Sequence, residues 1–232
     1  MTALVRMRLA GFFRGGRALA PLIAVLVVLG VIYGGGPSPA GAAYGYSAAA
    51  LFPVLAWLAK VLLDTEPDVQ RRLVRLAVGP ARESAAGLLA AALAGAVVCA
   101  AAMLAPFLFH GIRGPEAGSG ESSLGAGILL GVLAHGLSLI AAVALGALAG
   151  RAVTRRVLPG VATLVTGSIL VIVLGLTSSI APWLAPPVMA TARALNSGVT
   201  PAASTLAQLT AWSLAWSAVA FATYGAFRRS RS

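Results

Sequence analysis

The sequence is poor in the residues that carry most enzyme and metal chemistry. Its 232 residues include only six acids, two histidines, one lysine and one cysteine. A single cysteine excludes an internal disulfide and any zinc cluster built from several cysteines. A phosphate-binding loop of the G-x-x-x-x-G-K-S/T type needs a lysine after a glycine, whereas the one lysine, Lys60, follows Ala59. We therefore expect no metal site, no cofactor and no catalytic site of its own in this chain.

Charge is scarce, and apolar residues are abundant. Charged residues make up 10% of the chain, hydrophobic residues make up 59%, and the mean hydropathy is +0.92. Ordinary soluble domains are about 25% charged and about 45–50% apolar. The sequence therefore predicts an integral membrane protein. The net charge of +11 comes from arginines at the ends of apolar runs, as topology signals do. Aromatic residues are not interleaved with them, so we expect no nucleic-acid partner.

Six apolar stretches have the length, or nearly the length, of a membrane-spanning helix, which takes about 17–25 residues. They are 18–34, 42–63, 85–109, 124–149, 158–180 and 203–227. None alternates between polar and apolar residues as a barrel strand would. The predicted fold is all-α, a polytopic bundle of six transmembrane helices in one domain over residues 1–232. Two glycine pairs in the fourth span have the spacing that lets helix backbones approach: Gly127 with Gly131 and Gly146 with Gly150.

Basic residues predict the orientation. Of the 17 lysines and arginines, 15 fall on one side: before the first span, around the second-to-third and fourth-to-fifth connections, and after the last span. Only Arg113 and Arg193 fall on the other side. Because positive residues stay in the cytoplasm, we expect a multi-pass plasma-membrane protein with both termini cytoplasmic.

The segment 1–17 has a pattern of its own. Its apolar residues recur along one face of a helix, with arginines around them: Val5, Leu9, Phe12 and Phe13. This predicts an N-terminal amphipathic surface helix on the cytoplasmic side of the membrane. Two alternatives remain open. One is a disordered basic start, and the other is a signal peptide ending at the Ala-Gly-Ala of residues 40–42, which would leave five spans.

The connection 64–84 holds four of the six acids and four of the arginines. It has the marks of a short helix, because Thr65 can cap its start, Pro67 suits its first turn, and the dipeptide Gly79-Pro80 ends it. Its apolar residues share one face, with Arg71 and Arg75 opposite: Val69, Leu73, Leu76 and Ala77. Such a face needs a partner, either lipid or another protein. The acids at the start of the connection would be repelled by anionic lipid, which favours a protein.

With its six spans, internal termini, surface helix and amphipathic loop helix, the chain resembles the permease subunits of type-two ABC exporters. The stretch 66–71, Glu-Pro-Asp-Val-Gln-Arg, carries most of the local resemblance. The resemblance implies that 64–84 is a cytoplasmic coupling loop, which contacts an ABC ATPase subunit that holds ATP and Mg. The implied coupling residues are Glu66, Pro67, Asp68, Arg71, Arg72, Leu73, Arg75, Leu76 and Gly79. It further implies a second permease copy or a sister permease, and an external re-entrant connection at 181–202.

Within the spans, four residues are candidates for a substrate path: His135, Gln208, Trp212 and Trp216. An ionisable group at mid-membrane is often functional, although packing and hydrogen bonding between helices explain these residues better. The expected function is export of an apolar or amphipathic substrate by alternating access, in contact with membrane lipid. Three other functions remain open: the substrate-binding membrane subunit of a vitamin importer, an intramembrane enzyme that uses Ser138 with His135, or a scaffold.

Overall fold

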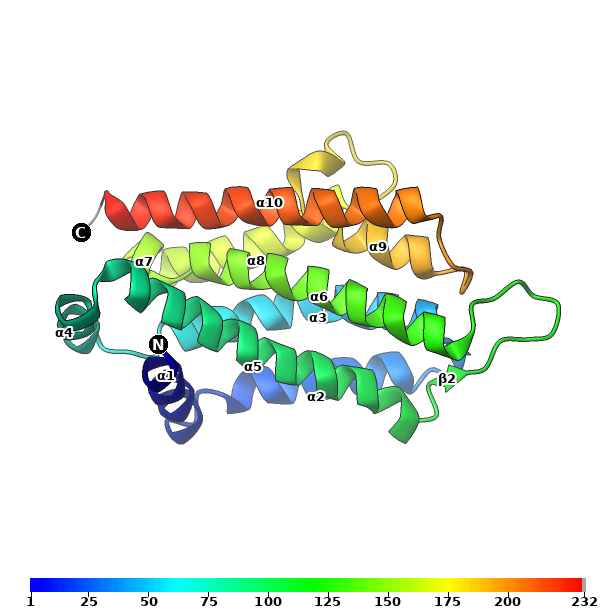
Figure 1. The fold of residues 1–232 in the computed structure, drawn as a ribbon, viewed down its shortest axis with the longest axis horizontal. Helices are drawn as coiled ribbons and strands as arrows, with labels where there is room; N and C mark the ends of the chain where they lie inside the picture. Colours follow the sequence, from blue (N-terminus) through cyan, green and yellow to red (C-terminus); the bar gives the residue numbers. More distant parts are fainter. Residues whose placement is uncertain (231–232) are drawn as a thin grey trace.

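The computed structural model of the chain describes residues 1–230, apart from the side chain of Asp68. It is a bundle of long helices that run along one axis (Figure 1). In chain order the elements are α1 (Thr2–Arg14), α2 (Leu19–Tyr33), β1 (Ser38–Pro39), α3 (Ala40–Leu63), α4 (Asp68–Val78), α5 (Pro80–Leu108), β2 (Ile112–Arg113), α6 (Leu124–Leu148), α7 (Arg151–Thr154), α8 (Val157–Leu174), the 3-10 turn η1 (Pro182–Leu184), α9 (Val188–Leu195) and α10 (Ala203–Arg229).

Within the described residues, four helical segments are long and apolar enough to cross a membrane. They are α3, α5, α8, and α6 continued through α7 as Leu124–Thr154. A fifth is added if α1 and α2, which meet at a bend of 78°, are counted as one broken span. Four of the six predicted spans are thus confirmed as candidate membrane helices: 42–63, 85–109, 124–149 and 158–180.

The first and last predicted spans are helical but do not meet the same criteria. The 15 residues of α2 rise only about 22 Å, which is less than the hydrocarbon thickness of about 30 Å. The 27 residues of α10 are long enough, but Gln208 and several serines and threonines dilute its apolar character. A bundle of six spans therefore remains a prediction.

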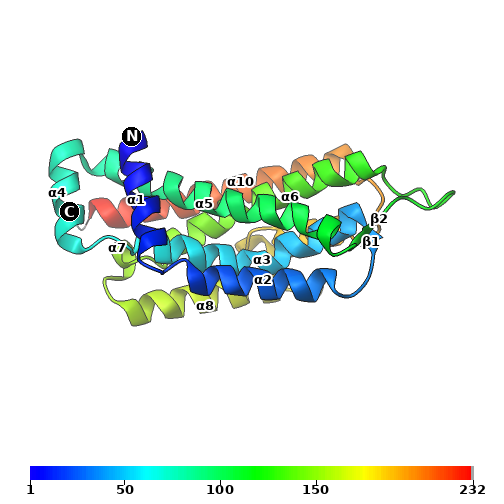
Figure 2. The ribbon, with the colours of Figure 1, turned by 90° about the horizontal axis from the view of Figure 1, so that it is seen from below.

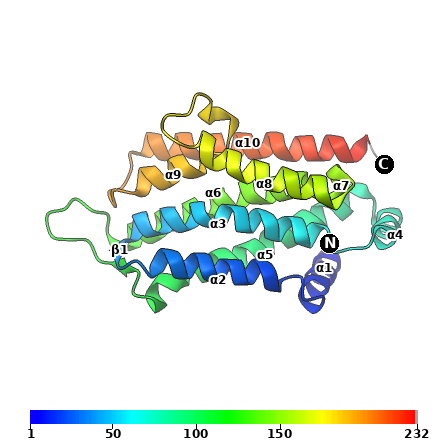
Figure 3. The same cartoon turned by 180° about the vertical axis from the view of Figure 1, so that it is seen from behind.

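Helix α3 forms the centre of the bundle. It packs along α6 and also contacts α2, α5 and α9, and Figure 3 shows it flanked by α2 and α8. The predicted glycine spacing on α6 serves this contact, because a Cβ on Gly131 would lie 2.6 Å from the ring of Tyr44, and one on Gly146 would lie 2.6 Å from the carbonyl oxygen of Ala56. The glycines therefore permit the close approach of α3 and α6.

The two ends of the bundle differ in character. At one end lie α1, α4, α7 and the last turn of α10; the connection 110–123 lies at the other (Figures 1 and 2). There, β1 and β2 form a two-residue parallel pair, with Ser38 opposite Ile112 and Pro39 opposite Arg113. The N-terminus and the end of α10 thus share the end where α4 lies. Which side of a membrane that end faces remains a prediction.

The connection 181–202 contains η1 and α9 and returns to the bundle. Val188, Thr191, Ala192 and Leu195 of α9 are buried, and α9 packs against α3. Its placement on the external side remains a prediction.

Helix α1 crosses the end of the bundle almost at right angles to the long helices (Figure 2). Its predicted apolar face is largely used within the chain, since Val5 and Phe12 are only 6% and 1% exposed. Leu9 is half-buried, whereas Phe13 is 54% exposed. The same helix also buries Arg8, whose partners belong to the site described next.

Candidate functional site

Helix α4 has sharply defined ends. Pro67, with an extended ψ of 149°, precedes its first residue, and Gly79 follows its last with φ 86°. A positive φ suits glycine, and Pro80 then starts α5 at once, where its missing N–H leaves no bond unmade. The expected cap at Thr65 is wrong, because its hydroxyl donates to the carbonyl oxygen of Val61, one turn back on α3, at 2.9 Å. Glycine and proline, and not a side-chain cap, thus separate α4 from its neighbours.

The face that α4 turns outward is apolar. Val69, Leu73 and Leu76 are 70%, 62% and 86% exposed. The opposite face points into the protein: Arg71 is buried, Arg75 is half-buried, and the Arg71 guanidinium donates to the carbonyl oxygen of Leu63 at 3.0 Å. The predicted periodicity of α4 is therefore present, with Arg71 and Arg75 inside and the leucines outside.

The inner side of α4 rests on a buried ion cluster centred on Glu83, which is 1% exposed. Its carboxylate accepts from Arg8 of α1 at 2.5 Å and from Arg75 of α4 at 3.4 Å, and it also pairs with Arg228 of α10. Arg8 in addition binds Glu66 at 2.7 Å. We call these five residues the Glu83 cluster. It joins α1, α4, α5 and α10 to the connection before α4.

Space for this cluster is provided by a glycine. A Cβ on Gly87, one turn after Glu83, would collide with the Arg8 guanidinium. Within residues 1–230, two buried atoms of the cluster lack a partner, Arg8 Nε and Glu66 Oε1. Buried charges are costly unless paired, so the cluster depends on each of its remaining contacts.

A second anchor holds the start of the connection 64–84. Asp64 accepts from Lys60 at 2.8 Å and from the backbone N–H of Arg151 at 2.8 Å. The Arg151 guanidinium in turn donates to the carbonyl oxygen of Asp64 at 2.8 Å. The connection is therefore tied to α3 and α7 before α4 begins.

Sequence reasoning implied a set of coupling residues in the connection 64–84 but missed the contacts that hold this connection in place. Among the implied coupling residues, Glu66 and Arg75 belong to the Glu83 cluster, Arg72 is exposed, and the side chain of Asp68 lies outside what the structure describes. Arg8, Glu83 and Arg228 were counted only as charge. The rarity of acids in this sequence was the available signal. An acid such as Glu83, next to an apolar span, needs a basic partner.

The candidate substrate-path residues do not come together. His135 lies buried between α6 and α3, where its Nδ1–H donates to the carbonyl oxygen of Gly131 at 2.9 Å and its Nε2 lies 3.2 Å from Ser47 Oγ. Gln208 is exposed and Trp212 half-buried on α10, and the indole N–H of Trp216 donates to the carbonyl oxygen of Leu184 at 2.9 Å. These contacts fix the packing of helices.

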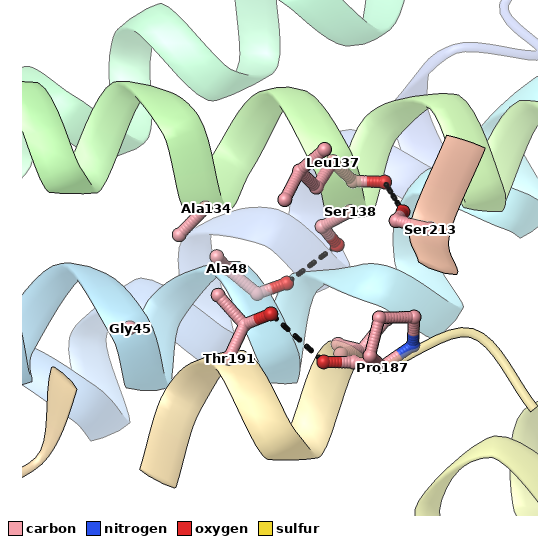
Figure 4. A pocket seen from close by; sticks show the side chains of 9 residues that line it. Gly45, Ala48, Ala134, Leu137, Ser138, Pro187, Thr191 and Ser213 are labelled. Atoms are coloured by element: carbon pink, nitrogen blue, oxygen red, sulfur yellow. Dashed lines mark hydrogen bonds between the residues drawn. The ribbon is translucent and has the colours of Figure 1, made fainter. Parts of the chain in front are cut away.

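A small pocket lined by Ala134 and Ser138 of α6 lies among α3, α6, α9 and α10 (Figure 4). Ser138 donates to the carbonyl oxygen of Ala48 at 2.7 Å, and Ser213 to that of Leu137 at 3.5 Å. The pocket measures about 10 Å³, which is the space of a single water molecule. It has no room for a transported substrate.

No family model, no curated protein and no solved structure matches the chain.

Proposed function

We propose that the chain is the membrane-spanning permease subunit of an ATP-driven ABC exporter, and that α4 is its contact with a separate ATPase chain. The observation that carries this proposal is the exposed apolar face of α4. A helix that rests on lipid would lie where the spans end, whereas α4 lies beyond them at the extremity of the long axis (Figures 1 and 3). Binding of an amphipathic helix in an apolar groove of a partner protein fits this position better.

The Glu83 cluster connects such a contact on α4 to other helices of the bundle. Arg75 links α4 to Glu83 of α5, and Glu83 is linked to α1 and α10 through Arg8 and Arg228. A force applied to α4 by an ATPase would therefore reach three helices at once. Alternating access needs a displacement of this kind, in which the bundle moves as a unit around a path.

The other components of the exporter are those that the resemblance to ABC exporter permeases implies. ATP and Mg would be held by the ATPase, and the substrate path would be formed with a second copy or a sister permease. Helix α8 presents exposed apolar residues, among them Leu158, Val165 and Ile169, which suit lipid or a second permease. Because ionisable residues are scarce in the candidate spans, we expect an apolar or amphipathic substrate.

An intramembrane hydrolase is the second candidate, favoured by the contact between Ser47 and His135 on facing helices. Both residues are buried, at 0% and 2% exposed, and neither lines the adjacent pocket. A substrate carbonyl would have no access to them. We therefore expect no labelling of Ser47 by a fluorophosphonate probe, and labelling lost in Ser47→Ala would favour the hydrolase. No observation favours a vitamin-importer subunit or a scaffold. The protein that co-purifies with the chain would distinguish these two functions from each other.

The proposal is tested by Leu73→Asp. The ATPase that co-purifies with the wild-type chain is first identified by mass spectrometry, and its affinity for each variant is then measured in detergent. A charge on the apolar face should weaken association about a hundredfold, equivalent to about 2.8 kcal/mol. Gln70→Asp introduces the same charge on the flank of α4 and should change affinity much less. If Leu73→Asp binds the ATPase as the wild type does, α4 is not the contact, and the proposed function fails.

A further inference from the structure

Arginines from three separate elements converge on one pocket at the charged end of the bundle. The pocket measures about 240 Å³ and opens between α4, α7 and α10. Apart from Ala152, its lining consists of arginines: Arg71, Arg72, Arg75, Arg151, Arg155 and Arg228.

Among the side chains that the structure describes, the acids around the pocket neutralise only part of this charge. Arg75 and Arg228 share the single carboxylate of Glu83, and Arg151 lies beside Asp64. The guanidinium groups of Arg72 and Arg155 make no ion pair or hydrogen bond with any residue that the structure describes. The pocket therefore carries an excess of positive charge, with two exposed guanidinium groups available to a ligand.

Membrane topology alone does not explain this arrangement. Positive-inside orientation depends on how many basic residues lie on one side, and it does not require that they face one another. Like charges brought together repel, and the repulsion grows where water is partly excluded. An anion that enters the pocket beside the exposed guanidinium groups of Arg72 and Arg155 would offset this repulsion.

We propose that this pocket, which we call the arginine pocket, binds a phosphate group of an anionic lipid headgroup or of a soluble phosphate compound. The planar guanidinium fork matches the oxygens of phosphate and forms strong, charge-assisted pairs with it. Part of the pocket lining, Arg151 and Ala152, belongs to the last turn of the candidate span Leu124–Thr154. Lipid phosphates lie at this depth, and basic pockets between transmembrane helices bind such headgroups.

This inference does not rest on the proposed transport function. The exposed leucines of α4 lie opposite Arg71 and Arg75, and Arg151, Arg155 and Arg228 of the pocket do not belong to α4, so both sites can be occupied together. The phosphate site can therefore exist whether the partner of α4 is an ATPase or another protein.

The test uses the full chain, purified in neutral detergent and stripped of lipid, with two probes. Native mass spectrometry measures the binding of cardiolipin against phosphatidylcholine, and calorimetry measures the binding of inorganic pyrophosphate. The double variant Arg72→Gln and Arg155→Gln should weaken binding of the preferred probe by about tenfold or more. The control double variant Arg14→Gln and Arg156→Gln removes the same charge outside the pocket and should change affinity less than about twofold.

A second variant separates binding from folding. Arg155 has φ 64°, a left-handed conformation that glycine adopts with less strain. Arg155→Gly should therefore keep or raise the unfolding temperature while it weakens phosphate binding. A loss of binding in that variant, with the fold intact, supports the pocket.

The outcomes distinguish the sources of the phosphate. Cardiolipin binding that depends on Arg72 and Arg155 identifies a lipid site, and pyrophosphate binding with the same dependence identifies a soluble ligand. The proposal is overturned if neither probe binds or if both double variants weaken binding equally.

Discussion

Helices α1 and α4 lie at the same end of the bundle, have 13 and 11 residues and both mix apolar residues with arginines. Nevertheless, the apolar face of α1 points into the protein, whereas the apolar face of α4 points away from it. α1 buries Val5 and Phe12 within the chain, whereas α4 exposes Leu73 and Leu76. Full burial of such a side chain contributes about 1.5–3 kcal/mol. In α1 this contribution stabilises the fold of the chain itself; in α4 it is left available to a partner.

The comparison also shows how α4 is held in place with its apolar face turned outward. Arg75 of α4 reaches the same carboxylate, Glu83, as Arg8 of α1. Because ion pairs hold α4 to the bundle, its apolar face stays free. Formation of these pairs removes several charges from water, which is unfavourable.

Glu83→Leu should have the largest effect, since it leaves Arg8, Arg75 and Arg228 without their shared carboxylate. Removal of one partner from a buried ion pair typically costs about 3–5 kcal/mol, and we expect a loss near the upper value. The free energy of unfolding can be measured by denaturant titration in mixed micelles. Glu116→Leu replaces an exposed acid in the connection 110–123 and should change the free energy little. Equal losses would contradict the central role of Glu83.

Truncation of the two apolar faces should give a smaller but contrasting effect. Phe12→Ala should lower the free energy of unfolding of the isolated chain by about 3 kcal/mol, because it removes a buried ring. Leu73→Ala should change it by less than about 0.5 kcal/mol, as exposed substitutions do. The same titration measures both. If Leu73→Ala destabilises the isolated chain as strongly as Phe12→Ala, the exposed face of α4 is part of its own fold.

The half-buried ion pair between Arg113 and Glu121 at the opposite end should give the smallest effect. A hydrogen bond from Arg113, and a further one from the backbone N–H of Glu116, lower the pKa of Glu121 to about 2. Because this pKa is below that of an unfolded chain, about 4.3, the pair stabilises the loop at neutral pH and is lost as the pH falls from about 4 towards 2. A spin label on Ala117→Cys should gain mobility over that range, and Glu121→Gln should be mobile already at pH 7.

The buried location of Cys99, the only cysteine, confines the label to position 117. Equal mobility of the wild-type loop and the Glu121→Gln loop at pH 7 would show that the ion pair does not order the connection. Global unfolding should be almost unchanged by this substitution, in contrast to Glu83→Leu.

The parts of the fold that were predictable from the sequence depend on local signals. Long apolar runs identified α3, α5, α6 and α8, and Gly79-Pro80 correctly placed the end of α4. Both signals act within a few turns of the chain. Whether α2 and α10 span a membrane was harder to judge. The bend between α1 and α2 depends on how neighbouring segments pack, and polar residues within α10 dilute its apolar character.

What could not be predicted depends on long-range contacts. The period of α4 was visible in the sequence, but which face points inward depends on Glu83, and Glu83 pairs with Arg8 and Arg228, which are 75 and 145 residues away. Thr65 had the sequence of a cap, yet its hydroxyl bonds back to the preceding helix. His135 had the position of a functional residue, but its partner Ser47 on α3 could only be found from the packing of α3 against α6.

The most direct test of the exposed face is photo-crosslinking in intact cells. A benzophenone amino acid at position 76, where Leu76 is 86% exposed, should form an adduct that mass spectrometry identifies as an ABC ATPase. The same probe at position 158 on α8, where Leu158 is 79% exposed, should give no ATPase adduct. An adduct of position 76 with lipid alone, or with a second copy of this chain, would contradict the assignment of α4 as the ATPase contact.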